Sequence, residues 1–199
     1  MTATAGPLGL GAPASGRPPV PAGLLVRAAT PADADGLAAL AALTFPLACP
    51  PDCPPADQQA YVAAHLTAAR FSGYVADPAR RVLLAVPAAG GPPVGYTMLV
   101  LGEPSDDDVR SALTLTPTVE VSKCYVHPDQ HGSGVATALM EAGLAVARAT
   151  GAAGAWLGVN QFNARAQRFY ERSGFAVVGT KHFRVGARVE DDFVLELAL

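Results

Sequence analysis

The sequence is short of cysteine, of charge and of long apolar runs, and each shortage excludes a class of protein. Three cysteines in 199 residues, two of them at Cys49 and Cys53, do not make the disulfide framework of a small secreted protein. No apolar run approaches the roughly 18 residues that cross a bilayer, so we expect no membrane partner. No basic stretch followed by an apolar core opens the chain, and we expect a cytoplasmic protein.

The net charge and the spacing of metal-ligating residues argue against two further kinds of partner, nucleic acid and metal ions. The net charge of −3 argues against nucleic acid as the main partner, because a basic patch is the usual footprint of such binding. Cys49 and Cys53 have no second Cys/His pair at metal-ligand spacing, so we expect two loop thiols and no metal. With 50% hydrophobic and 16% charged residues, the chain has ample material for one globular domain.

Residues 1–23 contain five prolines and five glycines, which predicts a flexible tail ahead of a domain over residues 24–199. Apolar patterns, caps and turn residues in that domain predict an α/β fold with a mixed, mainly antiparallel sheet flanked by helices. Strands are expected at 24–28, 81–86, 94–101, 119–126, 155–159, 175–178 and 189–197, and helices at 31–45, 56–76, 135–150 and 164–172. The acidic segment 103–108 and the segment 179–186 are expected to be loops, and Gly95 a bulge or a close approach.

The central stretch is a strand, Val119–Val126, followed by a glycine turn, His131–Gly134, and a helix. The unbonded N–H groups of such a turn and of the first helical turn bind anions, so we expect a phosphate-bearing ligand over residues 131–137. The stretch lacks the lysine of a nucleotide-binding P-loop. It also lacks the third glycine of a dinucleotide-binding turn, so neither of those sites fits.

The same stretch resembles the acetyl-CoA signature of the GCN5-related N-acetyltransferases (GNAT). The signature reads His131-Gly132-Ser133-Gly134-Val135-Ala136 here, with His131 where glutamine or arginine is usual. A second block, with Asn163, Ala166, Phe169-Tyr170 and Gly174-Phe175, follows in the order and at the spacing of the family. The resemblance covers roughly residues 24–199 and is densest over 119–175.

The resemblance implies a GNAT fold with acetyl-CoA as co-substrate, held where the fourth and fifth strands splay apart. The residues that match the cofactor-binding positions are Tyr125, Val126, His127, His131, Gly132, Ser133, Gly134, Val135, Ala136, Thr137 and Asn163. In the family the backbone at the position of Val126 holds the pantetheine arm, and its N–H could polarise the thioester carbonyl.

Two residues are the catalytic candidates. The resemblance assigns Tyr170 as the acid that protonates the departing CoA thiolate and Glu120 as the base that deprotonates the amine. We expect Glu120 and Val126 on one face of their strand, because their numbers differ by an even number. His127 and His131 are rival bases, and His182 could line the acceptor side.

The predicted function is transfer of acetyl from acetyl-CoA to a primary amine, with a small cationic amine such as a polyamine as the acceptor. The bacterial polyamine and small-amine acetyltransferases are the subgroup that the second half of the chain looks most like. Acetylation of a protein N-terminus or lysine, and a non-catalytic acetyl-CoA-binding module, remain the alternatives. The resemblance also leaves a homodimer open, since family members often pair through late strands.

Overall fold

The computed structural model describes residues 21–50, 52–185 and 188–199, so most of the predicted tail lies outside the described residues. The strands are β1 Leu24–Ala28, β2 Arg80–Pro87, β3 Gly95–Leu101, β4 Thr118–Val126, β5 Gly154–Asn160, β6 Ala176–Val185 and β7 Arg188–Ala198. The helices are α1 Ala34–Thr44, α2 Pro55–His65, α3 Ala68–Ala76, α4 Asp107–Ala112, α5 Val135–Ala149 and α6 Ala164–Arg172. Short 3-10 turns lie at η1 Pro31–Asp33, η2 Phe45–Ala48 and η3 Pro128–Gln130. No helix in these ranges has the length and apolarity to cross a membrane.

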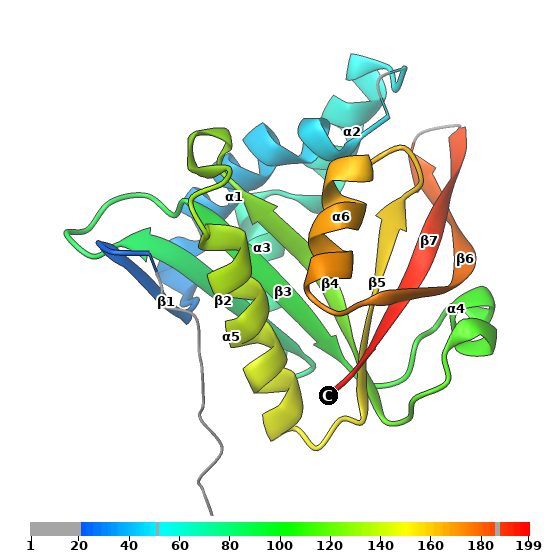
Figure 1. The fold of residues 1–199 in the computed structure, drawn as a ribbon. Coiled ribbons are helices and arrows are strands. Elements are labelled where there is room, and N and C mark those ends of the chain that lie inside the picture. The colour runs from blue at the N-terminus through cyan, green and yellow to red at the C-terminus, as the bar shows by residue number, and fades with distance from the viewer. Residues whose placement is uncertain (1–20, 51, 186–187) are drawn as a thin grey trace, which may run out of the picture.

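The described strands form one seven-stranded sheet in the order β1-β2-β3-β4-β5-β7-β6. All neighbours pair antiparallel except β4 and β5, which run parallel. Helices α5 and α6 lie on one face of this sheet and α1 and α3 on the other (Figure 1). The predicted mixed, mainly antiparallel α/β fold is therefore confirmed.

The two faces of the sheet carry separate apolar layers. Val82, Leu84, Tyr96 and Met98 pack under α1 and α3. On the opposite face, α5 packs so closely that a Cβ on Gly95 would lie 2.8 Å from the Leu139 side chain. Gly95 therefore marks a close approach between β3 and α5, which is one of the two alternatives predicted for it from the sequence.

A β-bulge in β4 corrects one prediction. Lys123 pairs with Met98 but Val121 pairs with Leu99, so Ser122 is the extra residue and the side-chain alternation shifts there. Glu120 therefore shares a face with Lys123 and Tyr125. Val126 points to the opposite face and packs with α5. The prediction that Glu120 and Val126 share a face was wrong, because counting residues assumes an unbroken strand.

Strands β4 and β5 separate soon after they meet. Their ladder contains only the pairs Thr118–Gly154, Val119–Ala155 and Glu120–Trp156, although β4 continues to Val126 and β5 to Asn160. A gap thus opens in the middle of the sheet beyond Glu120, as the resemblance implied. After the open end of β4, the chain passes through η3 and the glycine turn into α5.

The structure divides the predicted helix over residues 56–76 into α2 and α3. Leu66 leaves the helical conformation and is buried, and the Thr67 hydroxyl caps α3 by accepting from Arg70 N–H at 3.3 Å. Within α3, Phe71 is fully buried and Ala69 is exposed. A threonine that caps a new helix inside an apolar run was the sequence signal for this break.

Parts of two expected loops belong to regular elements, although residues 103–106 are a loop as predicted. Strand β6 runs on through residues 179–185 of the predicted loop, whose last residue, 186, lies outside the described residues. Gly179 accommodates α4 at a notional Cβ distance of 2.5 Å from Ala112. Within the acidic segment, the Asp106 carboxylate caps α4 by accepting from two backbone N–H groups. Val109 anchors α4 because it is fully buried.

Candidate active site

One cleft of about 570 Å³ lies over the gap between β4 and β5. Its floor is β4 from Glu120 to Val126, and one end is the glycine turn that leads into α5. α6 and the end of β5 form a second wall. On the opposite side, η2 contributes Phe45 and Leu47, and α2 contributes Tyr61. The cleft therefore passes from one face of the sheet to the other through the gap.

The glycine turn at one end of the cleft is shaped to bind an anion. Gly132 and Gly134 have φ angles of 79° and 92°, which side chains with a Cβ rarely adopt. Within the described residues, no hydrogen bond engages the N–H groups of Gly132, Gly134 and the first three residues of α5. These N–H groups and the positive end of the α5 dipole together favour a phosphate or pyrophosphate.

His131 and Arg165 form a bridge from this turn to α6. The His131 Nε2 atom lies 3.1 Å from the Val126 carbonyl oxygen, and Nδ1 lies 2.7 Å from the Arg165 guanidinium. The ring can donate to the carbonyl and accept from the guanidinium only when it is neutral. His131 thus replaces the usual glutamine or arginine of the motif and brings a cation from a different helix to the anion site.

The backbone of β4 faces the gap at alternate residues. His127 N–H donates to Val94 O at 2.8 Å, toward β3. Successive N–H groups of a strand point to opposite sides, so those of Cys124 and Val126 point toward the gap. Val126 can therefore offer its N–H to an extended ligand, while its carbonyl is engaged by His131.

Most of the predicted cofactor positions meet in this cleft, but three do not line it. Tyr125, Val126, His131, Gly132, Gly134, Ala136, Thr137 and Asn163 form part of its wall. The Val135 side chain is fully buried under the turn, so only its N–H could face a ligand. Ser133 donates from its hydroxyl to Gln130 O at 2.7 Å, and His127 accepts from Asp129 N–H at 3.2 Å. Asn163 caps α6 by accepting from Ala166 N–H at 3.1 Å.

Glu120 and Tyr170 line the same cleft from opposite faces of the sheet. Glu120 lies at the last β4–β5 pair, where the gap begins. Tyr170 lies on α6, with its ring centroid 5.4 Å from that of Phe169 and 6.1 Å from that of Phe175. Among the described side chains, neither the Glu120 carboxylate nor the Tyr170 hydroxyl has a hydrogen-bond or ion-pair partner. Both groups are therefore available to a ligand that occupies the gap.

The Acetyltransferase (GNAT) family model matches residues 44–175 of this chain. The chain belongs to the GNAT family. It is 48% identical over 163 residues to a protein of Mycobacterium tuberculosis (strain ATCC 25618 / H37Rv) that is named an uncharacterized N-acetyltransferase. That match covers 82% of this chain and 96% of the mycobacterial protein.

Solved structures of other acetyltransferases share the fold. PaiA N-acetyltransferase from Thermoplasma acidophilum, in complex with coenzyme A, has a TM-score of 0.69 at 14% identity, over 88% of this chain and 99% of that one. Arabidopsis thaliana NAA60, in complex with a bisubstrate analogue, has a TM-score of 0.68 at 16% identity, over 88% and 97% of the two chains. The GNAT protein described here is an acetyl-CoA-dependent N-acetyltransferase. No group of three metal-ligating side chains occurs in the part of the chain that the structure describes.

In this GNAT enzyme, burial favours the protonated form of two groups in the cleft wall, the Tyr170 phenol and the Cys124 thiol. Burial raises the pKa of the Tyr170 phenol well above its usual value, and the nearby Cys124 and Tyr125 raise it further. Tyr170 is therefore protonated at neutral pH, the state that an acid needs. Burial also raises the pKa of the Cys124 thiol to about 12, so this cysteine is not a ready thiolate nucleophile.

The rival bases of the GNAT enzyme are placed less favourably than Glu120. His127 and His182 do not line the cleft. His182 lies 3.3 Å from Asp108 and 3.6 Å from Asp191 at the far edge of the sheet. His131 lines the cleft, but it lies at the end with the glycine turn and both its ring nitrogens are engaged.

Sequence reasoning missed several charged residues of the cleft wall. Lys123, Lys181, Asp192 and Arg165 all line it. Lys181 on β6 and Asp192 on β7 are paired residues of the sheet. The Lys181 side chain reaches Gly158 on β5, where a Cβ on the glycine would lie 2.6 Å from the Lys181 Cε atom. The one available signal was Lys123, a lysine inside an apolar strand. The others depend on contacts between distant segments.

Proposed function

We propose that this GNAT enzyme acetylates the primary amine of a small molecule by direct transfer, with Glu120 as base and Tyr170 as acid. The observation that carries the proposal is that one cleft exposes a carboxylate and a protonated phenol on the two sides of the gap in the sheet. The cofactor roles expected for residues 125–137 and for Asn163 belong to the same proposal. Bound acetyl-CoA supplies the activated acyl group as a thioester.

The two side chains would act on different protons. An alkylammonium with a pKa near 10.4 must lose a proton before its nitrogen can attack, and the Glu120 carboxylate would accept that proton. As the new N–C bond forms and the C–S bond breaks, the Tyr170 hydroxyl would protonate the sulfur. The gap in the sheet would hold both reactants in register, and such proximity can supply about 7–11 kcal/mol in ideal cases.

We place the acceptor amine beside an apolar part of the cleft wall. Phe45 and Tyr61 stack at 4.5 Å and, with Leu47, form an apolar wall opposite the β6–β7 edge. A small cationic amine such as a polyamine, the acceptor expected from the resemblance, belongs to this class. The proposal includes the expected cytoplasmic location and the homodimer that the resemblance leaves open.

The test is release of CoA from acetyl-CoA in the presence of spermidine, an aromatic amine, amino acids, a lysine peptide and a peptide with a free N-terminus. Turnover of small amines alone would support the proposal. Turnover of peptides alone would replace it with protein acetylation. Binding of acetyl-CoA with no turnover on any amine would favour a non-catalytic acetyl-CoA-binding module.

A further inference from the structure

One lysine of the cleft wall has a position that the proposed reaction does not use. Lys123 is the first residue after the bulge in β4, and it lines the cleft on the same face as Glu120. On that face the two residues are adjacent positions of the strand, which puts their Cα atoms roughly 7 Å apart. Lys123 is therefore the nearest cation to the proposed base along β4.

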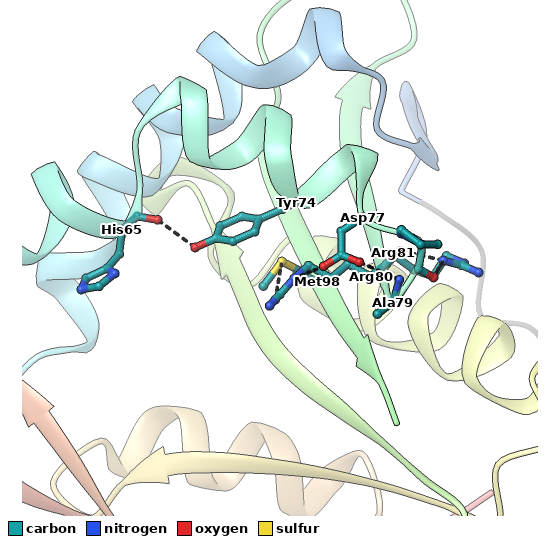
Figure 2. A network of polar contacts seen from close by, with 8 residues as sticks. His65, Tyr74, Asp77, Ala79, Arg80, Arg81 and Met98 are labelled. Atoms are coloured by element: carbon teal, nitrogen blue, oxygen red, sulfur yellow. Dashed lines mark hydrogen bonds and ion pairs between the residues drawn. The ribbon is translucent and has the colours of Figure 1, made fainter. Parts of the chain in front are cut away.

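The surroundings of Lys123 are aromatic and apolar. Its Nζ atom lies 5.8 Å from the centroid of the Tyr74 ring, and the Arg80 guanidinium lies 4.9 Å from the same ring. Figure 2 shows this corner of the sheet, where the Tyr74 hydroxyl donates to the His65 carbonyl and Arg80 lies between Asp77 and Met98. The Asp77 carboxylate is thus engaged by Arg80, at 3.0 Å, rather than by Lys123.

In the described ranges no carboxylate lies within ion-pair distance of the Lys123 ammonium, although the charge of Glu120 acts on it from farther away. No ion pair within 4.0 Å and no hydrogen bond from its ammonium occurs there. Burial lowers the pKa of this ammonium from its usual value, while Glu120 raises it and Arg80 lowers it further. Burying a cation is unfavourable unless an anion or hydrogen-bond acceptors compensate it, and the cleft is the open side from which a ligand could do so.

We propose that the acceptor of this enzyme carries a carboxylate that binds Lys123 while its primary amine lies at Glu120. This inference rests on the proposed function and names its substrate class, an amino acid-like amine rather than a polycation. A single ammonium matches the single charge of a carboxylate. Because the two residues are neighbours on one face of β4, a short carbon chain can join the two groups of the acceptor. A second ammonium at that position would instead face Lys123 and Arg80.

The test uses three amines of equal chain length: 4-aminobutyrate, butylamine and putrescine. For the unaltered enzyme we expect kcat/KM to be highest with 4-aminobutyrate and lowest with putrescine. In Lys123→Met, which keeps the length and apolar stem, we expect the ratio of kcat/KM for 4-aminobutyrate to that for butylamine to fall about tenfold to hundredfold. Lys123→Arg keeps the charge and should keep that ratio within a few-fold.

Arg81→Met is the matched control, because Arg81 is an exposed cation that donates only to the carbonyls of Pro78 and Arg80 in the described residues. It should leave the ratio unchanged. A purely structural role of Lys123 would lower kcat/KM for all three amines together, and a constant ratio in Lys123→Met would overturn the inference. So would putrescine as the preferred acceptor.

Failure of the proposed function gives a different result. If none of the three amines is acetylated although acetyl-CoA binds, the reaction assigned to the cleft is wrong for small amines. Calorimetric titration of the CoA complex with 4-aminobutyrate then decides the role of Lys123. Binding that weakens tenfold or more in Lys123→Met supports the carboxylate site, and binding that is absent or equal in both proteins refutes it.

Discussion

Replacing Tyr170 with phenylalanine removes one hydroxyl group from the cleft and leaves the ring. The aromatic contacts with Phe169 and Phe175 do not involve the hydroxyl, and no described residue accepts a hydrogen bond from it. We therefore expect the free energy of unfolding of Tyr170→Phe to stay within about 1 kcal/mol of that of the unaltered protein. The affinity for acetyl-CoA should also stay the same, since the phenol is assigned to the departing sulfur and not to ground-state binding.

The effect on turnover should be large. A positioned acid contributes about 10²–10⁴ in rate, and each tenfold is about 1.36 kcal/mol, so the activation free energy should rise by about 3–5 kcal/mol. The raised pKa of Tyr170 also predicts that, in the unaltered enzyme, this acid stays protonated up to at least about pH 10. Steady-state CoA release over pH, with calorimetry for acetyl-CoA and a thermal melt, measures these quantities.

Tyr96→Phe is the matched control. The Tyr96 hydroxyl is fully buried, has no hydrogen-bond partner among the described atoms and lies outside the cleft. Its removal should leave kcat unchanged and keep or raise stability. Full activity in Tyr170→Phe would refute the assignment of the acid. An equal loss in both variants would show that turnover responds to packing under β4 and not to the phenol of Tyr170.

Four further outcomes follow from the structure. Glu120→Gln should lower kcat/KM about 10²–10⁴-fold with unchanged acetyl-CoA affinity, measured by steady-state kinetics and calorimetry. Arg165→Met should raise the Kd for acetyl-CoA about three- to tenfold, by calorimetry at low salt, because a guanidinium beside the anion turn is lost. Gly95→Ala should lower the free energy of unfolding by about 1–3 kcal/mol in urea, since its Cβ meets Leu139 at 2.8 Å, whereas Gly73→Ala meets nothing within 4 Å and should raise it by about 0.5–1 kcal/mol. Asp33→Asn should cost about 1 kcal/mol near pH 7, because the hydrogen bonds from Arg27 and Thr30 hold the pKa of Asp33 well below its usual value.

The lowered pKa of Asp33 determines the pH range in which its carboxylate contributes to the free energy of unfolding. A carboxylate with a depressed pKa in the folded state contributes its stability fully above its unfolded pKa of about 3.9, and that contribution is lost as the pH falls toward the folded value. The denaturation free energies of Asp33→Asn and the unaltered protein should therefore converge in acid. A difference in unfolding free energy that persists at low pH would contradict the role of the Asp33 charge.

Unchanged activity in Glu120→Gln would transfer the role of base to His131 or to water.

Local signals were enough to predict several of the element boundaries. Strand β1 begins and ends where its apolar run does, at Leu24 and Ala28. Asn163 caps α6, and Gly174 adopts the left-handed conformation at its end, with φ of 93°, as their residue types indicate. Each of these features depends on residues within a few positions of one another, so the sequence alone contains the information.

Features set by pairing between distant segments could not be predicted in the same way. The bulge at Ser122 has no glycine or proline to mark it and exists only in the register between β4 and β3. The extra residue decides which side chains of β4 share a face. Because of it, Glu120 lies on the face of Lys123 and not on the face of Val126. The ordering of α4 likewise depends on Val109 reaching Trp156 and Val194 across the chain.

The gap between β4 and β5 also has a consequence for folding. Where the ladder stops after Glu120–Trp156, backbone groups that would join the two halves of the sheet are left without strand partners across the gap. A pantetheine chain bound there would take the place of the missing ladder and tie the halves together. Saturation with acetyl-CoA at 100 times its Kd would raise the free energy of unfolding by about 2.7 kcal/mol. Amide exchange should then slow first along the open half of β4 and at the end of β5, so that the co-substrate also acts as a structural element of the sheet.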